Sequence, residues 1–248
     1  EQYERIKTDL NDEERIPSAY YQNGEMYNFW RDQKNVRGIW RKTSFESYLE
    51  DEPVWENILD IDQLAKDEGI NWLYKGADCL APEYKQCLIR LSDGGTDAVT
   101  IREFDLEEKQ FVKDGFNTYP SKQNASWINK DQILIGADFG DGTMNESGYP
   151  MQVKLWNRGE ALEEAKIFFS GSYEKIFNFP FVSIRPDGEY YGIIEGPTFF
   201  SKVLHLFDGE TLIKVDLPKM IEIHGFFRDS LILTIEEDWG IFSSGSLL

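Results

Sequence analysis

The sequence is poor in cysteine, histidine and basic residues. It has two cysteines and two histidines in 248 residues, and 26 Lys and Arg stand against 45 Asp and Glu, a formal charge of −19. Two cysteines do not make a disulfide scaffold, and this set cannot build a Cys/His zinc centre. The negative field repels phosphate, which argues against nucleic-acid binding and against docking on an anionic membrane.

Long apolar runs and a leader are also missing. No run approaches the roughly 20 residues that a membrane-spanning helix needs. The chain starts Glu1-Gln2-Tyr3 without an initiator Met or an apolar signal core, so we expect an excised piece of a longer protein. The compartment stays open between cytoplasm and periplasm.

The composition is that of a folded protein of one or two domains. Hydrophobic residues make up 41% and aromatic residues 15% of the chain. Short runs rich in Val, Ile, Tyr, Phe and Trp alternate with Gly, Asp, Asn and Pro, which predicts an all-β fold. The clearest predicted strands are 86–91, 98–105, 132–137, 152–156, 189–194, 202–207 and 230–235. Helical spacing is limited to residues 1–14 and 61–68.

The strands recur with a fixed spacing. A strand ending in a small acidic turn is followed by a second strand that closes on an aromatic residue, and these residues, Phe104, Trp156 and Phe207, lie 52 and 51 positions apart. A period of about 50 residues with roughly four strands is typical of a β-propeller blade. We count four copies and the first half of a fifth, residues 221–235. Because an unpaired blade edge is normally avoided, the sequence looks cut within this blade, and its open edge is a candidate dimer contact.

Several segments together resemble the prolyl oligopeptidase family of serine peptidases, in its N-terminal propeller. They stand in the family's order and spacing between about residues 15 and 170. The segments are Arg-Ile-Pro at 15–17, Tyr-Asn-Phe-Trp-Arg-Asp at 27–32, Arg-Gly-Ile-Trp-Arg-Lys-Thr at 37–43, residues 56–63, Gly-Ile-Asn-Trp at 69–72, Leu-Ser-Asp-Gly-Gly-Thr-Asp-Ala at 91–98, Arg-Glu-Phe-Asp at 102–105 and Ser-Gly-Tyr-Pro at 147–150.

The resemblance implies a seven-bladed propeller above an α/β-hydrolase domain with a Ser–Asp–His triad that cleaves short peptides after proline. In this interpretation residues 1–14 are a lead-in from the missing catalytic domain. Residues 15–248 are then an incomplete propeller of about four and a half blades, truncated at both ends. The propeller would admit peptides and exclude folded proteins. Its expected partners are the hydrolase domain of the same parent chain and short peptide substrates.

No catalytic residue is assigned in this chain. A hydrolase nucleophile needs Gly-x-Ser-x-Gly, because the serine sits on a strained turn that only small neighbours permit, and no such window occurs. No cofactor-binding or metal residue is assigned either, and the substrate-binding residues stay unknown. Two other functions are alternatives: a free-standing protein-interaction module, and a glycan-active propeller enzyme, which needs paired carboxylates around one cavity.

The remaining motifs have a structural explanation that we favour. Free buried thiols are favoured over a bridge, which would need the hairpin register to place the two cysteines opposite each other. We interpret the acidic loop residues as a solvated turn, the lone histidines as structural or surface residues, the aromatic clusters as packing between blades and the strand arginines as surface residues. The glycosylation-like triplets are interpreted as chance matches. The residues concerned are Cys79, Cys87, Asp138, Phe139, Gly140, Asp141, Asn145, Asn124, His205, His224, Tyr20, Tyr21, Phe177–Phe181, Arg37, Arg41, Arg90 and Arg102.

Overall fold

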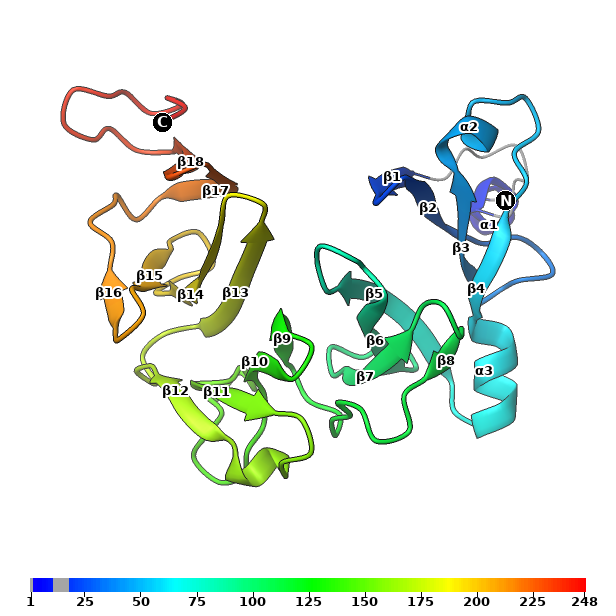
Figure 1. The fold of residues 1–248 in the computed structure, drawn as a ribbon, viewed down its shortest axis with the longest axis horizontal. Helices are drawn as coiled ribbons and strands as arrows, with labels where there is room; N and C mark the ends of the chain where they lie inside the picture. Colours follow the sequence, from blue (N-terminus) through cyan, green and yellow to red (C-terminus); the bar gives the residue numbers. More distant parts are fainter. Residues whose placement is uncertain (1, 11–17) are drawn as a thin grey trace. The chain divides into compact units, whose positions relative to one another are not determined.

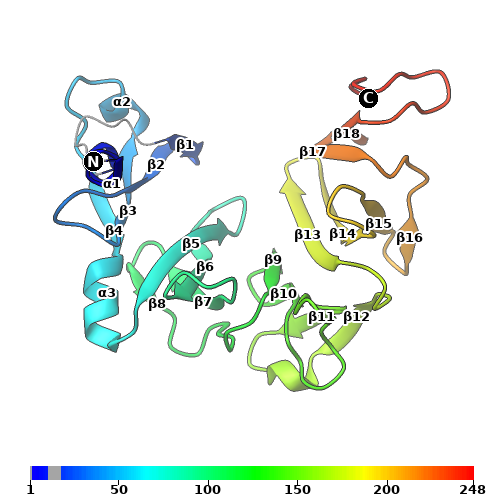
Figure 2. The ribbon, with the colours of Figure 1, turned by 180° about the vertical axis from the view of Figure 1, so that it is seen from behind.

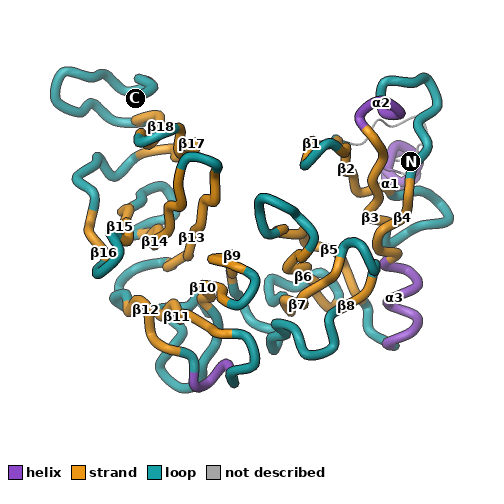
Figure 3. The backbone as a smooth tube through the Cα atoms, viewed as in Figure 1, coloured by secondary structure: helices purple, strands orange, loops and turns teal. Residues whose placement is uncertain are grey.

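The computed structural model describes residues 2–10 and 18–248, and strands dominate it (Figure 3). Helical structure in the described residues is limited to α1 (Gln2–Leu10), α2 (Phe45–Tyr48), α3 (Ile61–Glu68) and the short 3₁₀ turn η1 (Leu162–Glu164). The chain divides into two compact units, which we describe separately. Unit 1 is Glu1–Cys79 with Glu83–Asn117, and unit 2 is Leu80–Pro82 with Thr118–Leu248.

Unit 1 contains two four-stranded antiparallel sheets whose strands follow chain order (Figure 1). The first sheet consists of β1 (Ala19–Gln22), β2 (Glu25–Trp30), β3 (Ile39–Ser44) and β4 (Glu56–Asp60). The second consists of β5 (Trp72–Cys79), β6 (Gln86–Asp93), β7 (Thr100–Asp105) and β8 (Gln110–Phe111). Sequential antiparallel strands need only short connections, which is why turn-forming residues separate the apolar runs.

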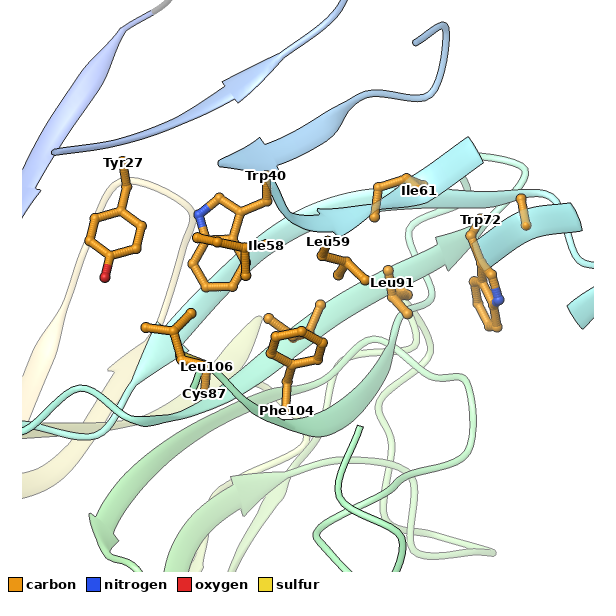
Figure 4. Packing of buried hydrophobic residues seen from close by; sticks show 12 residues of the cluster. Tyr27, Trp40, Ile58, Leu59, Ile61, Trp72, Cys87, Leu91, Phe104 and Leu106 are labelled. Atoms are coloured by element: carbon orange, nitrogen blue, oxygen red, sulfur yellow. The ribbon is translucent and has the colours of Figure 1, made fainter. Parts of the chain in front are cut away.

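The two sheets of unit 1 share one hydrophobic core, drawn in Figure 4. Trp40 from β3 and Phe104 from β7 are each 1% exposed, and their ring centroids lie 6.4 Å apart. Helix α3 joins the sheets and adds Ile61, which is fully buried. Asp60 caps this helix by accepting a hydrogen bond from the Gln63 backbone N–H at 2.9 Å. The alternating apolar residues of neighbouring sheets therefore pack face to face.

Unit 2 repeats the same architecture (Figures 1 and 2). One sheet has β9 (Asn124–Asn129), β10 (Gln132–Gly136), β11 (Gln152–Asn157) and β12 (Lys166–Ser170). The next has β13 (Phe177–Arg185), β14 (Gly188–Gly196), β15 (Val203–Phe207) and β16 (Leu212–Lys214). The hairpin of β17 (Ile221–Phe227) and β18 (Ser230–Ile235) follows. Residue Leu248 then pairs with Leu233 of β18, through hydrogen bonds of 2.8 and 3.0 Å.

The predicted fold class is confirmed, with four four-stranded sheets and the start of a fifth. Helix 61–68 has the predicted bounds, and the strands match the predictions to within a few residues. The predicted helix 1–14 is seen as Gln2–Leu10, and its positions 1 and 11–14 lie outside the described residues. No helix in the described residues is long and apolar enough to cross a membrane.

The prediction that the two cysteines are free thiols was wrong. The structure joins Cys79 and Cys87 in a disulfide. The register of β5 on β6 shifts between Tyr74 and Gly76, and it brings Cys79 directly opposite Cys87. A one-residue change of register would have placed the two side chains on opposite faces. The spacing of the cysteines does not contain that information.

Candidate docking face of unit 2

The connections of unit 2 emerge at two opposite ends of its sheets. Within an antiparallel sheet that follows chain order, the links from first to second strand and from third to fourth leave at one end. The link from second to third strand and the link to the next sheet leave at the other. We call the second set the loop end: segments 118–123, 137–151, 171–176, 197–202, 215–220 and 236–246. The first set is the turn end: segments 130–131, 158–161, 186–187, 208–211 and 228–229. The rest of the β11–β12 connection folds back toward the loop end, where Leu162 and Glu163 line a cavity with Tyr119, Asp138 and Gly140.

Neighbouring segments of the loop end are hydrogen-bonded to one another. The Asn145 side chain donates to the carbonyls of Lys175 and Ile176 at 3.1 and 2.9 Å. Its Oδ1 accepts from the Tyr149 backbone N–H at 2.9 Å, which closes the long β10–β11 connection on itself. The Tyr173 hydroxyl also donates to the Gly142 carbonyl. The loops are therefore held in place by one another.

The same linkage continues to the last hairpin. The Lys202 backbone N–H donates to the Lys219 carbonyl at 2.7 Å. Glu237 Oε1 accepts from the backbone N–H groups of Lys219 and Met220 at 2.7 and 3.1 Å. A carboxylate that accepts hydrogen bonds from two backbone N–H groups fixes the loop that carries those groups. The loop end is a connected surface and not a set of separate turns.

Tyr149 is the centre of an aromatic cluster at this end. Its ring lies 6.4 Å from the rings of Phe179 and Phe199, and Lys122 Nζ lies 4.5 Å above it. Phe199 is 62% exposed and its neighbour Phe200 is 79% exposed. Aromatic side chains that are packed on one side and open to solvent on the other are typical of contact surfaces.

Both ends carry charged residues, but within the segments defined above the exposed large apolar side chains lie at the loop end. Exposed large apolar residues of the loop end are Tyr119, Tyr173, Phe199, Phe200, Met220, Trp239, Ile241 and Phe242. The turn end carries charged residues at its tips: Lys130, Asp131, Arg158, Asp187, Asp208, Glu210, Arg228 and Asp229. Ile241 is 92% exposed. Because monomeric soluble proteins rarely expose many apolar side chains together, the loop end is the candidate docking face.

The arginines and aromatic clusters noted in the sequence make internal contacts. Tyr20 stacks on Tyr27 at 5.5 Å, Phe177 on Phe179 at 4.5 Å, and Phe181 on Phe226 at 6.1 Å. Arg37 lies near the Asp62 carboxylate and donates to the Trp72 carbonyl, and Arg102 pairs with Glu68 and lies over the Phe111 ring. Arg41 donates to Asn28 and lies over the rings of Trp30 and Trp55. Arg90 interacts with the charge of Asp78.

The two histidines lie on different sheets, as expected. His224 Nε2 is 2.8 Å from the Thr234 hydroxyl, across the β17–β18 pair. His205 Nε2 is 3.8 Å from Glu195 Oε2, and both side chains are largely buried. Burial lowers the pKa of His205, although the Glu195 charge opposes that shift. Neither histidine has a serine or cysteine nucleophile among these partners.

The acidic loop forms ordinary turns. Asp138 Oδ1 accepts from the Gly140 backbone N–H at 2.9 Å. In the described residues no group of three His, Cys, Asp or Glu side chains is arranged to hold a metal ion. Both hydrogens of the Asn145 amide go to backbone carbonyls.

The sequence did not predict the loop end as a docking face. The available signal was aromatic residues beside loop-forming Gly and Pro, at Gly148-Tyr149-Pro150 and Pro197 to Phe200.

Successive four-stranded antiparallel sheets in chain order are the blades of a β-propeller. Residues 1–216 match the family model described as the prolyl oligopeptidase N-terminal beta-propeller domain. The chain therefore belongs to that family. A post-proline cleaving enzyme from Rickettsia typhi has a solved structure that is 30% identical, with a TM-score of 0.90 over 100% of this chain and 39% of its own. Oligopeptidase B from Leishmania major shares the fold at 13% identity, with a TM-score of 0.69 over 94% of this chain and 32% of its own.

The curated relatives are longer proteins. An uncharacterized peptidase from Sinorhizobium fredii is 34% identical over 97% of this chain and 35% of its own length. A second, from Rickettsia prowazekii, is 29% identical over 96% of this chain and 36% of its own. The chain spans about a third of the length of these relatives.

Proposed function

We propose that this chain is the non-catalytic propeller of a longer prolyl-oligopeptidase-like serine peptidase. The loop end of unit 2 then contacts the α/β-hydrolase domain of the same parent chain. The observation that carries the proposal is the concentration of exposed aromatic and aliphatic side chains at this one end. The match to only 35% of the Sinorhizobium relative leaves room for a second domain in the parent.

The chain topology of unit 1 supports docking at the equivalent end of its own sheets. Strand β1 starts at the end of its sheet from which the β2–β3 connection leaves, which in unit 1 corresponds to the loop end of unit 2. A segment that arrives from another domain would enter there. Helix α1 leaves Tyr3 and Ile6 exposed by 72% and 57%. We therefore assign residues 1–14 as the lead-in from the catalytic domain and residues 15–248 as propeller.

The role in the parent is selection by size. The propeller would let short peptides reach a Ser–Asp–His site that cleaves after proline, and it would exclude folded proteins by its dimensions. This chain supplies no nucleophile for that reaction, because it has no Gly-x-Ser-x-Gly segment. We expect the isolated chain to leave a short proline-containing chromogenic peptide intact, and turnover by pure chain would contradict this.

Hydrogen exchange of the isolated 248-residue chain and of the full-length parent tests the docking face. We expect segments 137–151, 197–202 and 236–246 to exchange more slowly in the parent, because the hydrolase domain covers them. The turn end, at 186–187 and 208–211, serves as the internal control and should exchange equally in both. Slower exchange at the turn end alone, or no difference anywhere, would refute the assignment.

Substitutions in the full-length parent give a second test. Phe200→Asp and Ile241→Asp place a charge in the proposed interface and should increase cleavage of a large unfolded protein relative to a short peptide. Phe227→Asp, at a residue 57% exposed beside the turn end, is the matched control. A partner-binding module without a hydrolase domain remains the alternative. It is supported if the source gene stops after Leu248 and the chain is a stable, closed monomer, whereas a dimer formed through the edge of the last blade supports the fragment.

A further inference from the structure

A cavity lies between two neighbouring sheets of unit 2. It has a volume of about 330 Å³ and is lined by residues of β9–β12 and of β13–β16 together with the β15–β16 turn. Small-molecule sites have volumes of about 300–1,000 Å³ and are mostly apolar with a few placed polar groups. The cavity is distinct from the docking face, because its lining includes the turn-end residues Glu210 and Thr211.

Three aromatic side chains form one wall of this cavity. The Phe207 ring centroid lies 5.5 Å from that of Phe168 and 5.1 Å from that of Tyr191, and the Phe168–Tyr191 separation is 6.3 Å. Each ring is partly buried. Leu155 from β11 and Leu212 from β16 line the same cavity. A wall of this kind accepts the side chain of an apolar ligand.

The cavity also has one charge of each sign in its lining. Lys166 starts β12, and Glu210 lies in the β15–β16 turn. Both are exposed, and neither the Lys166 ammonium nor the Glu210 carboxylate makes an ion pair or hydrogen bond within residues 2–10 and 18–248. Charges that have no partner in the protein remain available to a ligand.

We propose that this cavity binds an amino acid with a large apolar side chain in its zwitterionic form. The ligand carboxylate pairs with Lys166, its ammonium pairs with Glu210, and its side chain packs on Phe168, Tyr191 and Phe207. The presence of both charges favours a zwitterion over an anion or a cation alone. All lining residues belong to this chain, so the site is independent of the hydrolase domain and of the proposed peptidase role.

NMR titration of the backbone amides of the 248-residue chain tests the site. The probes are phenylalanine, N-acetylphenylalaninamide and glycine. We expect phenylalanine to shift resonances of β12, β14 and β15 and to bind several-fold more tightly than the uncharged N-acetylphenylalaninamide, since each exposed charge pair is worth up to about fivefold. Glycine, which lacks the apolar side chain, should not bind. Equal affinity for phenylalanine and its uncharged analogue would overturn the proposal.

Single-charge variants assign each ligand group to its partner. Lys166→Gln should weaken phenylalanine about fivefold and leave phenylalaninamide, which has no carboxylate, unaffected. Glu210→Gln should weaken phenylalanine by a similar factor and leave N-acetylphenylalanine unaffected. Lys130→Gln and Glu222→Gln remove the same charges outside the cavity and control for net charge. A loss that is the same in variant and control, or no loss at all, refutes the site.

Discussion

The partly buried carboxyl of Asp78 is expected to make the stability of the fold depend on pH. Burial raises the pKa of Asp78 to about 6 from its ordinary value of 3.8, although the Arg90 charge opposes the shift. The folded chain then binds more protons than the unfolded chain between these two values, so this contribution is fully present below pH 3.8 and is lost as pH rises through 6. Between pH 4 and pH 7 the loss amounts to about 2.5 kcal/mol.

Asp78→Asn removes the ionisation and keeps the shape of the side chain. We therefore expect the variant to become more stable relative to the native sequence as pH rises, by about 2.5 kcal/mol between pH 4 and pH 7. The assay is urea unfolding of both proteins at four pH values, followed by tryptophan fluorescence. The difference between the two free energies of unfolding is the quantity of interest, because it cancels every other titrating group.

Asp51→Asn, at an exposed position between α2 and β4, controls for the change in net charge. A difference between Asp78→Asn and the native sequence that does not vary with pH would refute the reasoning. In that event Asp78 ionises in the folded chain as readily as in the unfolded chain.

Three further predictions follow from single contacts. Burial lowers the pKa of His205 below 6.5, so the native chain should lose stability as the pH falls from 7.5 to 5. His205→Gln should make this loss smaller in urea unfolding. An unchanged loss would show that the imidazole is not held neutral in the fold. Cys87→Ser should lower the free energy of unfolding by about 2.5 kcal/mol because it opens the Cys79–Cys87 loop, and reductant should then have no further effect. An alanine Cβ at Gly192 would collide with the His205 carbonyl, so Gly192→Ala should cost about 3 kcal/mol or more in thermal or urea unfolding. If Gly192→Ala were as stable as the native chain, β14 and β15 would be able to move apart at Gly192.

Local patterns determined most of the fold. Helix 61–68 could be placed to the residue because Asp60 caps it and Gly69, with a φ of 68°, ends it. The repeating blades could be recognised because each half-buried strand alternates apolar and polar residues, and because turn formers recur at a fixed spacing. The family could be recognised from short segments that stand in a fixed order along the chain.

The candidate sites depended on positions that are far apart in sequence. Tyr149, Phe199 and Ile241 share one face only because three loops leave their sheets at the same end. Lys166 and Glu210 line one cavity because two neighbouring sheets pack side by side. The Cys79–Cys87 bridge depended on a single shift in strand register. Sequence by itself thus determined what each strand and turn is, since those depend on nearby residues. Only the tertiary structure decided which loops and side chains meet, because that depends on pairing register and on packing between sheets.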